Sequence, residues 1–230
     1  MKTTKFKFIV VASVAATTLV GCSNSNSSTS TPSETAANPQ ASPSTGTVAF
    51  ADCAAAKFGS DLTPVNPPAN VHKYSGAPAM TINPSKLYQA TITTKAGTIV
   101  LCLQPELAPM TVNNFVTLTR NKFYNGLTFH RVEPGFVIQG GDPTGTGSSG
   151  PGYQFNDEAV RAPYVDGAVA MANSGPNTNG SQFFIDIADN TQALSEPLYN
   201  VFGKVETGLD VAKKVQKGDV MTSVTVKEQT

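Results

Sequence analysis

The sequence predicts a mainly β protein, a sheet closed into an antiparallel β-barrel and capped by two short α-helices. Short segments alternate apolar and polar residues with the two-residue period of strands. After residue 84, two segments, 109–121 and 209–216, have helical character. Turn-forming Gly and Pro residues separate the segments. Many short antiparallel strands lose their exposed edges when a sheet closes on itself, so a barrel is favoured.

The regular pattern starts with a predicted hairpin and continues to the end of the sequence. Segments 88–94 and 98–103 alternate around Lys95-Ala96-Gly97. The predicted helix 109–121 opens with Pro109, which suits a first turn. Further strands are predicted, in order, at 127–132, 136–140, 167–172, 182–187 and 220–227.

The first 22 residues are interpreted as a lipoprotein signal peptide. Three lysines precede an apolar run at 8–20, which is too short to span a bilayer comfortably. The run ends Leu19-Val20-Gly21-Cys22 and resembles the bacterial lipobox, so lipidation is expected at Cys22. An ordinary secretory signal is the alternative. Residues 23–47, rich in Ser, Thr and Pro, are predicted to be a flexible tether.

Residues 48–83 are predicted to form an irregular extension that packs on the barrel. Segment 53–58 could make a short helix, but the prolines that follow favour extended structure. Cys53 and Cys102 are the only cysteines besides Cys22, and an exported chain meets conditions that permit disulfides. We expect these two to pair. Two free thiols that act as small apolar residues are the alternative.

The composition excludes several classes of function. Charged residues are 14% of the chain and the formal net charge is zero. Without residues 1–22, three of the 16 basic residues are lost, so 13 basic residues face 16 acidic ones. This is not the basic surface of a nucleic-acid-binding protein. Two histidines and three scattered cysteines predict no metal site. Gly145 to Gly152 lacks the ending of a phosphate-binding loop, so no cofactor is expected.

Two motifs indicate the chemistry. FHRVEPGFVIQGGD at 129–142 places an arginine and a glutamine among apolar residues around a tight turn. Strand alternation puts Phe129 with Arg131 on one face, and Val137 with Gln139 on one face. An unpaired guanidinium is costly to bury, so Arg131 is either functional or an edge residue bonded to a carbonyl. In MANSGPNTNGSQFFI at 171–185, a long turn leads into a strand.

Together with VFGKV at 201–205, these motifs resemble the cyclophilin family of peptidyl-prolyl cis/trans isomerases. The resemblance covers roughly residues 84–230, which we interpret as a cyclophilin-like isomerase domain. It implies a closed barrel of eight strands, capped by the two helices. It also implies an enzyme that needs no metal or cofactor.

The resemblance assigns roles to individual residues. Arg131 would donate a hydrogen bond to the prolyl nitrogen and keep its charge at any relevant pH. Gln139 and Phe136 complete the expected catalytic set. His130 is expected to be structural. The expected substrate-binding residues are Val137, Ala172, Asn173, Gln182, Phe184, Leu194 and Tyr199. The alternative for the aromatic residues of this set is that they only form part of the apolar core of the barrel.

The sequence departs from the common family pattern at a few positions. Val137 stands where methionine is frequent, and Tyr199 where histidine is frequent. The segment 193–199 contains no tryptophan, and neither does the rest of the chain. Eukaryotic members often have a tryptophan there that contacts the inhibitor cyclosporin. Weak cyclosporin sensitivity is therefore expected.

The leading hypothesis is an exported, lipid-anchored, monomeric isomerase of a bacterial cell envelope. Its expected partners are proline-containing polypeptides and, through Cys22, a membrane. The alternative is a cyclophilin-like module that binds Pro-containing segments, with incidental isomerisation. A purely structural envelope lipoprotein would leave Arg131 unexplained.

Overall fold

The computed structural model of this chain describes residues 46–230. The predicted signal peptide, Cys22 and nearly all of the predicted tether lie outside the described residues. The described elements, in chain order, are a 3-10 helix η1 (Cys53–Ala55), β1 (Phe58–Asp61), β2 (Tyr88–Thr94), β3 (Gly97–Leu103), α1 (Pro109–Arg120), β4 (Arg131–Glu133), β5 (Val137–Gly140), β6 (Ala168–Met171), β7 (Phe183–Asp186), β8 (Val201–Thr207), α2 (Leu209–Ala212) and β9 (Ser223–Gln229).

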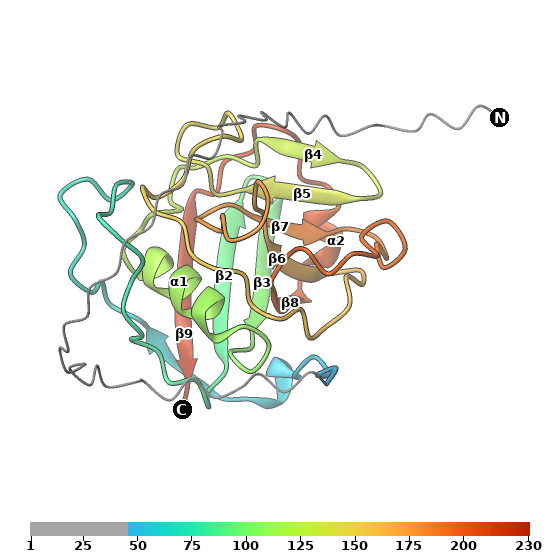
Figure 1. The fold of residues 1–230 in the computed structure, drawn as a ribbon, viewed down its shortest axis with the longest axis horizontal. Helices are drawn as coiled ribbons and strands as arrows, with labels where there is room; N and C mark the ends of the chain where they lie inside the picture. Colours follow the sequence, from blue (N-terminus) through green and yellow to red (C-terminus); the bar gives the residue numbers. More distant parts are fainter. Residues whose placement is uncertain (1–45) are drawn as a thin grey trace, which may run out of the picture. The chain divides into compact units, whose positions relative to one another are not determined.

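The strands form one antiparallel sheet in the order β1-β9-β2-β3-β8-β6-β7-β5-β4 (Figure 1). The predicted closure into a barrel is wrong, because the sheet of the described residues is open. The predicted number of eight strands is not confirmed, because this sheet has nine. The ninth strand, β1, comes from the extension. At the other end, residues before β4 meet those before β9 through a single bridge, Thr128 with Val220, which is too short to form a ladder.

The hairpin of β2 and β3 has the predicted alternation. Every second residue of β2 is buried, and the register runs from Tyr88 opposite Leu103 to Thr94 opposite Gly97. This hairpin contributes Ile92, Ile99 and other apolar side chains to the main core.

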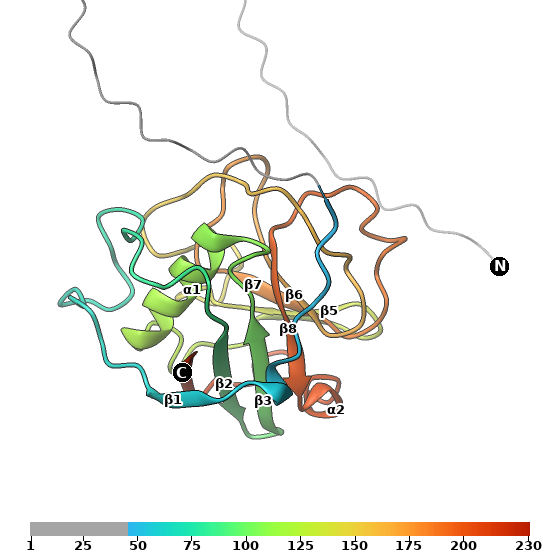
Figure 2. The same ribbon diagram turned by 90° about the horizontal axis from the view of Figure 1, so that it is seen from below.

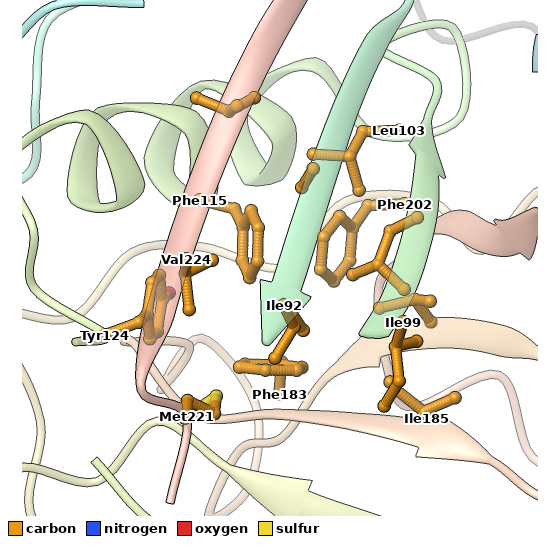
Figure 3. Packing of buried hydrophobic residues seen from close by; sticks show 14 of the residues in the cluster. Ile92, Ile99, Leu103, Phe115, Tyr124, Phe183, Ile185, Phe202, Met221 and Val224 are labelled. Atoms are coloured by element: carbon orange, nitrogen blue, oxygen red, sulfur yellow. The ribbon is translucent and has the colours of Figure 1, made fainter. Parts of the chain in front are cut away.

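The main core lies between α1 and the sheet. Figure 3 shows Phe115 of α1 among side chains from several strands. Its ring stacks on Tyr124, with 4.9 Å between centroids, and meets Phe183 of β7 edge-on at 5.3 Å. These rings are fully buried. The helix therefore anchors β7, which is also a strand of the site described below.

The second helix is shorter than predicted. We expected a helix over 209–216, but α2 ends at Ala212. Beyond it, the amides of Lys214 and Val215 bond to carbonyls only three residues back. Such tight turns use the same apolar residues but do not continue an α-helix.

The extension contains a short 3-10 helix, within the segment 53–58 where the sequence allowed a helix, and a strand that the sequence did not predict. The main-chain amide of Val48 donates a hydrogen bond to the carbonyl of Arg161 (2.8 Å). The extension then runs past β3 and β8 and forms η1 and β1 (Figure 2). A disulfide joins Cys53 to Cys102 of β3, the pair expected from the sequence. Strand β1 then pairs with β9. The extension is thus held covalently and by a strand ladder.

Over residues 46–230, no helix is both long and apolar enough to cross a membrane.

Candidate active site

Strand register brings the predicted site residues onto one face of β4, β5, β7 and β6. Arg131 lies opposite Gln139, and Gln139 lies opposite Phe184. Phe184 in turn lies opposite Ala170. Directly opposed residues of antiparallel strands share a face. A cation, an amide and an aromatic ring therefore form one row across the sheet.

The turn between β4 and β5 sets Phe136 beside Arg131. The amide of Phe136 donates to the carbonyl of Glu133 (3.0 Å), with Pro134 and Gly135 between them. Gly135 has φ +71°, the left-handed value that a type II turn requires at this position. The result places the Arg131 guanidinium carbon 5.7 Å from the centre of the Phe136 ring.

An apolar wall lies on this face of the sheet. It combines the buried Val137 and Phe184 with the partly buried Phe136, Leu194 and Tyr199. Phe184 and Tyr199 meet edge-on, with 5.4 Å between ring centroids. The partly buried Ala172 packs against the same cluster. This wall can receive a small apolar ring beside Arg131.

The guanidinium of Arg131 remains accessible. The side chain is 43% exposed, and its ion pair with Glu133 is long, 3.8 Å from Nε to Oε1. Exposed pairs of this kind contribute little energy. The donors of Arg131 are therefore not committed to a strong partner within the described residues.

The amide side chains predicted to bind substrate are bonded within the protein. Gln139 Nε2 donates to Gln182 Oε1 (2.9 Å), and Gln182 Nε2 donates to the carbonyl of Ser149 (2.9 Å). Asn173 Nδ2 donates to the carbonyl of Leu198 (2.8 Å). These bonds fix the positions of the amides.

A groove of about 440 Å³ adjoins this row. Its lining includes Gln139, Gln182 and Asn173 together with loop 147–154. This Gly-rich loop lacks the ending of a phosphate-binding loop, and no local pattern of its sequence indicated that it would face the site.

Asp142 organises the start of that loop. Its carboxylate accepts hydrogen bonds from the amides of Thr144, Gly147 and Ser149, and from the Thr144 hydroxyl. Burial raises the pKa of Asp142, but these bonds outweigh burial and lower the pKa to about 2. The carboxylate stays ionised and ties the loop together.

His130 is buried and suited to a structural role. Neither ring nitrogen has a hydrogen-bond partner within the described residues. Burial lowers the pKa of His130, so the ring is neutral at pH 7. The ring lies against the start of the groove loop, near Gly147.

The predicted grouping of Phe129 with Arg131 is wrong. Phe129 is fully buried in the main core near Phe183, whereas Arg131 is exposed. Strand alternation does not apply here because β4 starts only at Arg131.

Sequence reasoning also missed three residues behind the wall. Tyr164, Asp186 and Asn190 are all buried there. Asp186 had a local signal in the sequence, because it is the acidic residue that ends the otherwise apolar segment Phe-Phe-Ile-Asp. No local signal marked Tyr164, whose hydroxyl bonds to the main chain of Tyr199, 35 positions later.

This fold and this row of residues define a cyclophilin-type isomerase. Residues 89–230 match the family model described as "Cyclophilin type peptidyl-prolyl cis-trans isomerase/CLD". The chain belongs to this family, and it is an enzyme of the peptidyl-prolyl cis-trans isomerase class.

Curated relatives and solved structures agree. The chain is 51% identical to peptidyl-prolyl cis-trans isomerase B of Bacillus subtilis over 126 residues, which is 54% of this chain and 87% of the relative. It is 45% identical to the Helicobacter pylori (strain 26695) isomerase over 144 residues, 61% of this chain and 87% of the relative. A crystal structure of a Cryptosporidium parvum cyclophilin type isomerase aligns with TM-score 0.56 and 32% identity, over 61% of this chain and 97% of that chain.

Proposed function

We propose that this isomerase acts on X-Pro bonds of exported or envelope proteins, with Arg131 as the donor to the prolyl nitrogen. The register that places Arg131, Gln139 and Phe184 in one row carries the assignment. Arg131, whose donors lack a strong partner in the described residues, lies beside an apolar wall that a proline ring could cover.

The chemistry requires positioning rather than a nucleophile. The X-Pro bond resists rotation by roughly 20 kcal/mol because of its partial double bond. A hydrogen bond to the prolyl nitrogen favours the twisted state, in which the nitrogen lone pair is freed from conjugation. One charged hydrogen bond contributes about 1.5–3 kcal/mol. An acceleration of ~10⁵ requires about 7 kcal/mol. The wall and the fixed amides supply the remainder by orienting the substrate.

Substrate binding is expected to be weak and tolerant of sequence. The proline ring would cover Phe136, Val137, Phe184 and Leu194. Burial of its three methylene groups would contribute roughly 2 kcal/mol to binding, without the entropic cost of association. On binding, Gln139 and Gln182 would give up their hydrogen bond to each other and form hydrogen bonds to the peptide backbone instead. A second structure of the Cryptosporidium parvum isomerase, solved "in the presence of dipeptide ala-pro", aligns with TM-score 0.54 and 31% identity, over 60% of this chain and 98% of that chain. This supports a proline peptide as ligand here.

The test is an isomerisation assay on a short X-Pro peptide with the full chain and its Arg131→Ala variant. We expect kcat/KM to fall roughly a hundredfold, which is about 2.7 kcal/mol of barrier. Arg120→Ala is the matched control and should leave activity unchanged, because the side chain of Arg120 bonds to the carbonyl of Thr63 and not to a residue of the site, as far as residues 46–230 show.

A folded wild type that is no faster than buffer would overturn the catalytic assignment. Binding of the same peptide without acceleration would then favour the alternative, a module that holds Pro-containing segments. Equal activity of wild type and Arg131→Ala would remove Arg131 from the mechanism.

We also propose that the protein is lipid-anchored at Cys22 on a bacterial cell membrane, as a monomer on the tether 23–47. The sequence of residues 1–22 supports this. Expression of the full chain in a bacterial host, followed by membrane fractionation, tests it. Wild type should be found with membranes, and Cys22→Ser should leave them. A wild type recovered entirely in the soluble fraction would contradict the proposal.

A further inference from the structure

A buried carboxyl group lies directly behind the apolar wall. Asp186 ends β7 and is fully buried. It shares the face of Val137, which lies opposite, and of Phe184, two positions before it. One carboxyl oxygen accepts a hydrogen bond from Asn190 Nδ2 (2.5 Å). The other oxygen is buried without a hydrogen-bond partner within the described residues.

Asn190 connects this carboxyl group to the wall. Its side-chain amide donates a second hydrogen bond to the carbonyl of Phe136 (2.9 Å), which uses both of its hydrogens. Its main-chain carbonyl accepts from the amide of Leu194 (2.8 Å), and its main-chain amide donates to the carbonyl of Tyr164 (2.9 Å). Asn190 thus bonds to two of the expected proline contacts, to Phe136 through its side chain and to Leu194 through its main-chain carbonyl. The carbonyl of Phe136 also accepts from the amide of Ile187 (2.9 Å).

We propose that Asp186 and Asn190 are positioning residues of the proline site, and that the charge of Asp186 sets the affinity for X-Pro substrates. This inference rests on the proposed function and deepens it. Neither residue touches the substrate. Asp186 holds the amide of Asn190, and Asn190 holds Phe136 and Leu194.

The charges around Asp186 favour a change of state near neutral pH. Burial is the largest cause and raises the pKa of Asp186. The hydrogen bond from Asn190 lowers this pKa, whereas the carboxylates of Asp166 and Asp189 raise it further. The resulting pKa of Asp186 is about 7. Lys213 is paired with Asp166 (2.6 Å).

Two further ionisable groups face Asp186 from neighbouring elements. Glu133 of β4 lies in the same row, beyond Val137, and is exposed. Tyr164 lies behind the wall, and its pKa is raised to about 12, so it stays neutral. Asp186 is therefore the group of this set placed to titrate between pH 6 and 8.

The direction of the effect follows from hydrogen-bond strength. An ionised carboxylate accepts a stronger hydrogen bond than a protonated one. Above pH 7, Asn190 and the wall should be held firmly and KM should be low. We expect KM to rise about fivefold from pH 8.5 to 5.5, while kcat stays constant.

The experiment measures kcat and KM of the full chain on an X-Pro peptide from pH 5.5 to 8.5, together with Kd of the same peptide by NMR. The variants are Asp186→Asn and, as matched control, Asp189→Asn, an exposed carboxylate in the following turn. At every pH, Asp186→Asn should have the high KM and Kd that wild type has at pH 5.5. Asp189→Asn should keep a pH-dependent KM, with the midpoint moved to lower pH because Asp189 no longer raises the pKa of Asp186.

A wild-type pH profile in Asp186→Asn would overturn the proposal. If that variant does not fold, wild type alone decides, because the NMR signal of the Leu194 amide should titrate together with the Asp186 carboxyl. A Leu194 signal that does not follow Asp186 would overturn the proposal equally. A protein that binds peptide with the expected pH dependence but does not turn it over would contradict the proposed function and support this inference.

Discussion

Single buried polar residues hold the loops of this site in place. Asp142 is 1% exposed, and its carboxylate gathers amides from three positions of the loop that lines the groove. Gln139 and Gln182 are similarly fixed by each other. The site is therefore ordered without a bound peptide.

Asp142→Ala should lower the free energy of unfolding at pH 7. The pKa of Asp142 is about 2, below the ordinary 3.8, so its contribution is present above pH 4 and is lost as the pH falls through 2. A shift of this size corresponds to about 2 kcal/mol. Urea unfolding at pH 7 and pH 2.5 measures it, with the exposed Asp61→Ala as control. A loss of stability at pH 2.5 as large as that at pH 7 would contradict the explanation.

The sequence indicated which residues gather at the candidate site better than it indicated their hydrogen-bond partners. Arg131, Gln139 and Phe184 could be named from two motifs. The bond between Gln139 and Gln182 joins positions 43 apart and depends on the pairing of β5 with β7. The contacts of Asp186 were equally hidden, because they depend on where the loop after β7 returns to Phe136.

At the scale of elements, helix α1 starts with help from a distant loop. No side chain at its own N-cap, Ala108, bonds to the helix. Instead, the carboxylate of Glu158 accepts from the amides of Met110 (2.9 Å) and Thr111 (2.8 Å). A negative group at this end also complements the helix dipole.

Glu158→Ala should destabilise the protein by about 1–2 kcal/mol, the usual cost of losing an N-cap. Glu158→Gln should cost less, because one carbonyl oxygen remains as an acceptor. Thermal unfolding of both variants at pH 7 measures this. Equal stability of wild type and Glu158→Ala would show that water replaces the cap.

Elements were predictable where their partners are near in sequence. The β2–β3 hairpin and α1 follow from local periodicity. Strand β1 does not, because Phe-Gly-Ser-Asp has no alternating pattern, and its register is set by β9 about 170 positions later. The predicted closed barrel failed for a similar reason. Closure would need residues before β4 to pair with residues before β9, about 90 positions later, and in the described residues only the bridge of Thr128 with Val220 forms there.

At the scale of the molecule, a covalent bond joins the extension to the sheet. The disulfide between Cys53 and Cys102 spans 49 positions and sits where the extension crosses β3 (Figure 2). Lys204 of β8 lies 5.5 Å from the centre of the Phe50 ring, beside this crossing. The extension is thus part of the folded unit.

Replacing both cysteines by alanine should lower the free energy of unfolding by about 4 kcal/mol, the chain-entropy value for a loop of this length. Activity should be kept, because neither cysteine contacts the wall. Guanidinium unfolding with and without reductant measures this. Reductant should destabilise wild type to the level of the variant and leave the variant unchanged. A variant as stable as oxidised wild type would contradict the prediction.

The pairing of β2 with β9 has a consequence for the timing of folding. Thr93 pairs with Ser223, so β2 can pair with β9 only after about 130 further residues have been synthesised. At about 5–20 residues per second, that takes a ribosome roughly 6–26 s. During this interval the β2–β3 hairpin has an unpaired edge and α1 lacks part of the surface it covers. The growing chain is then still unfolded, which is the state that passage through a membrane pore, as in the proposed export, requires.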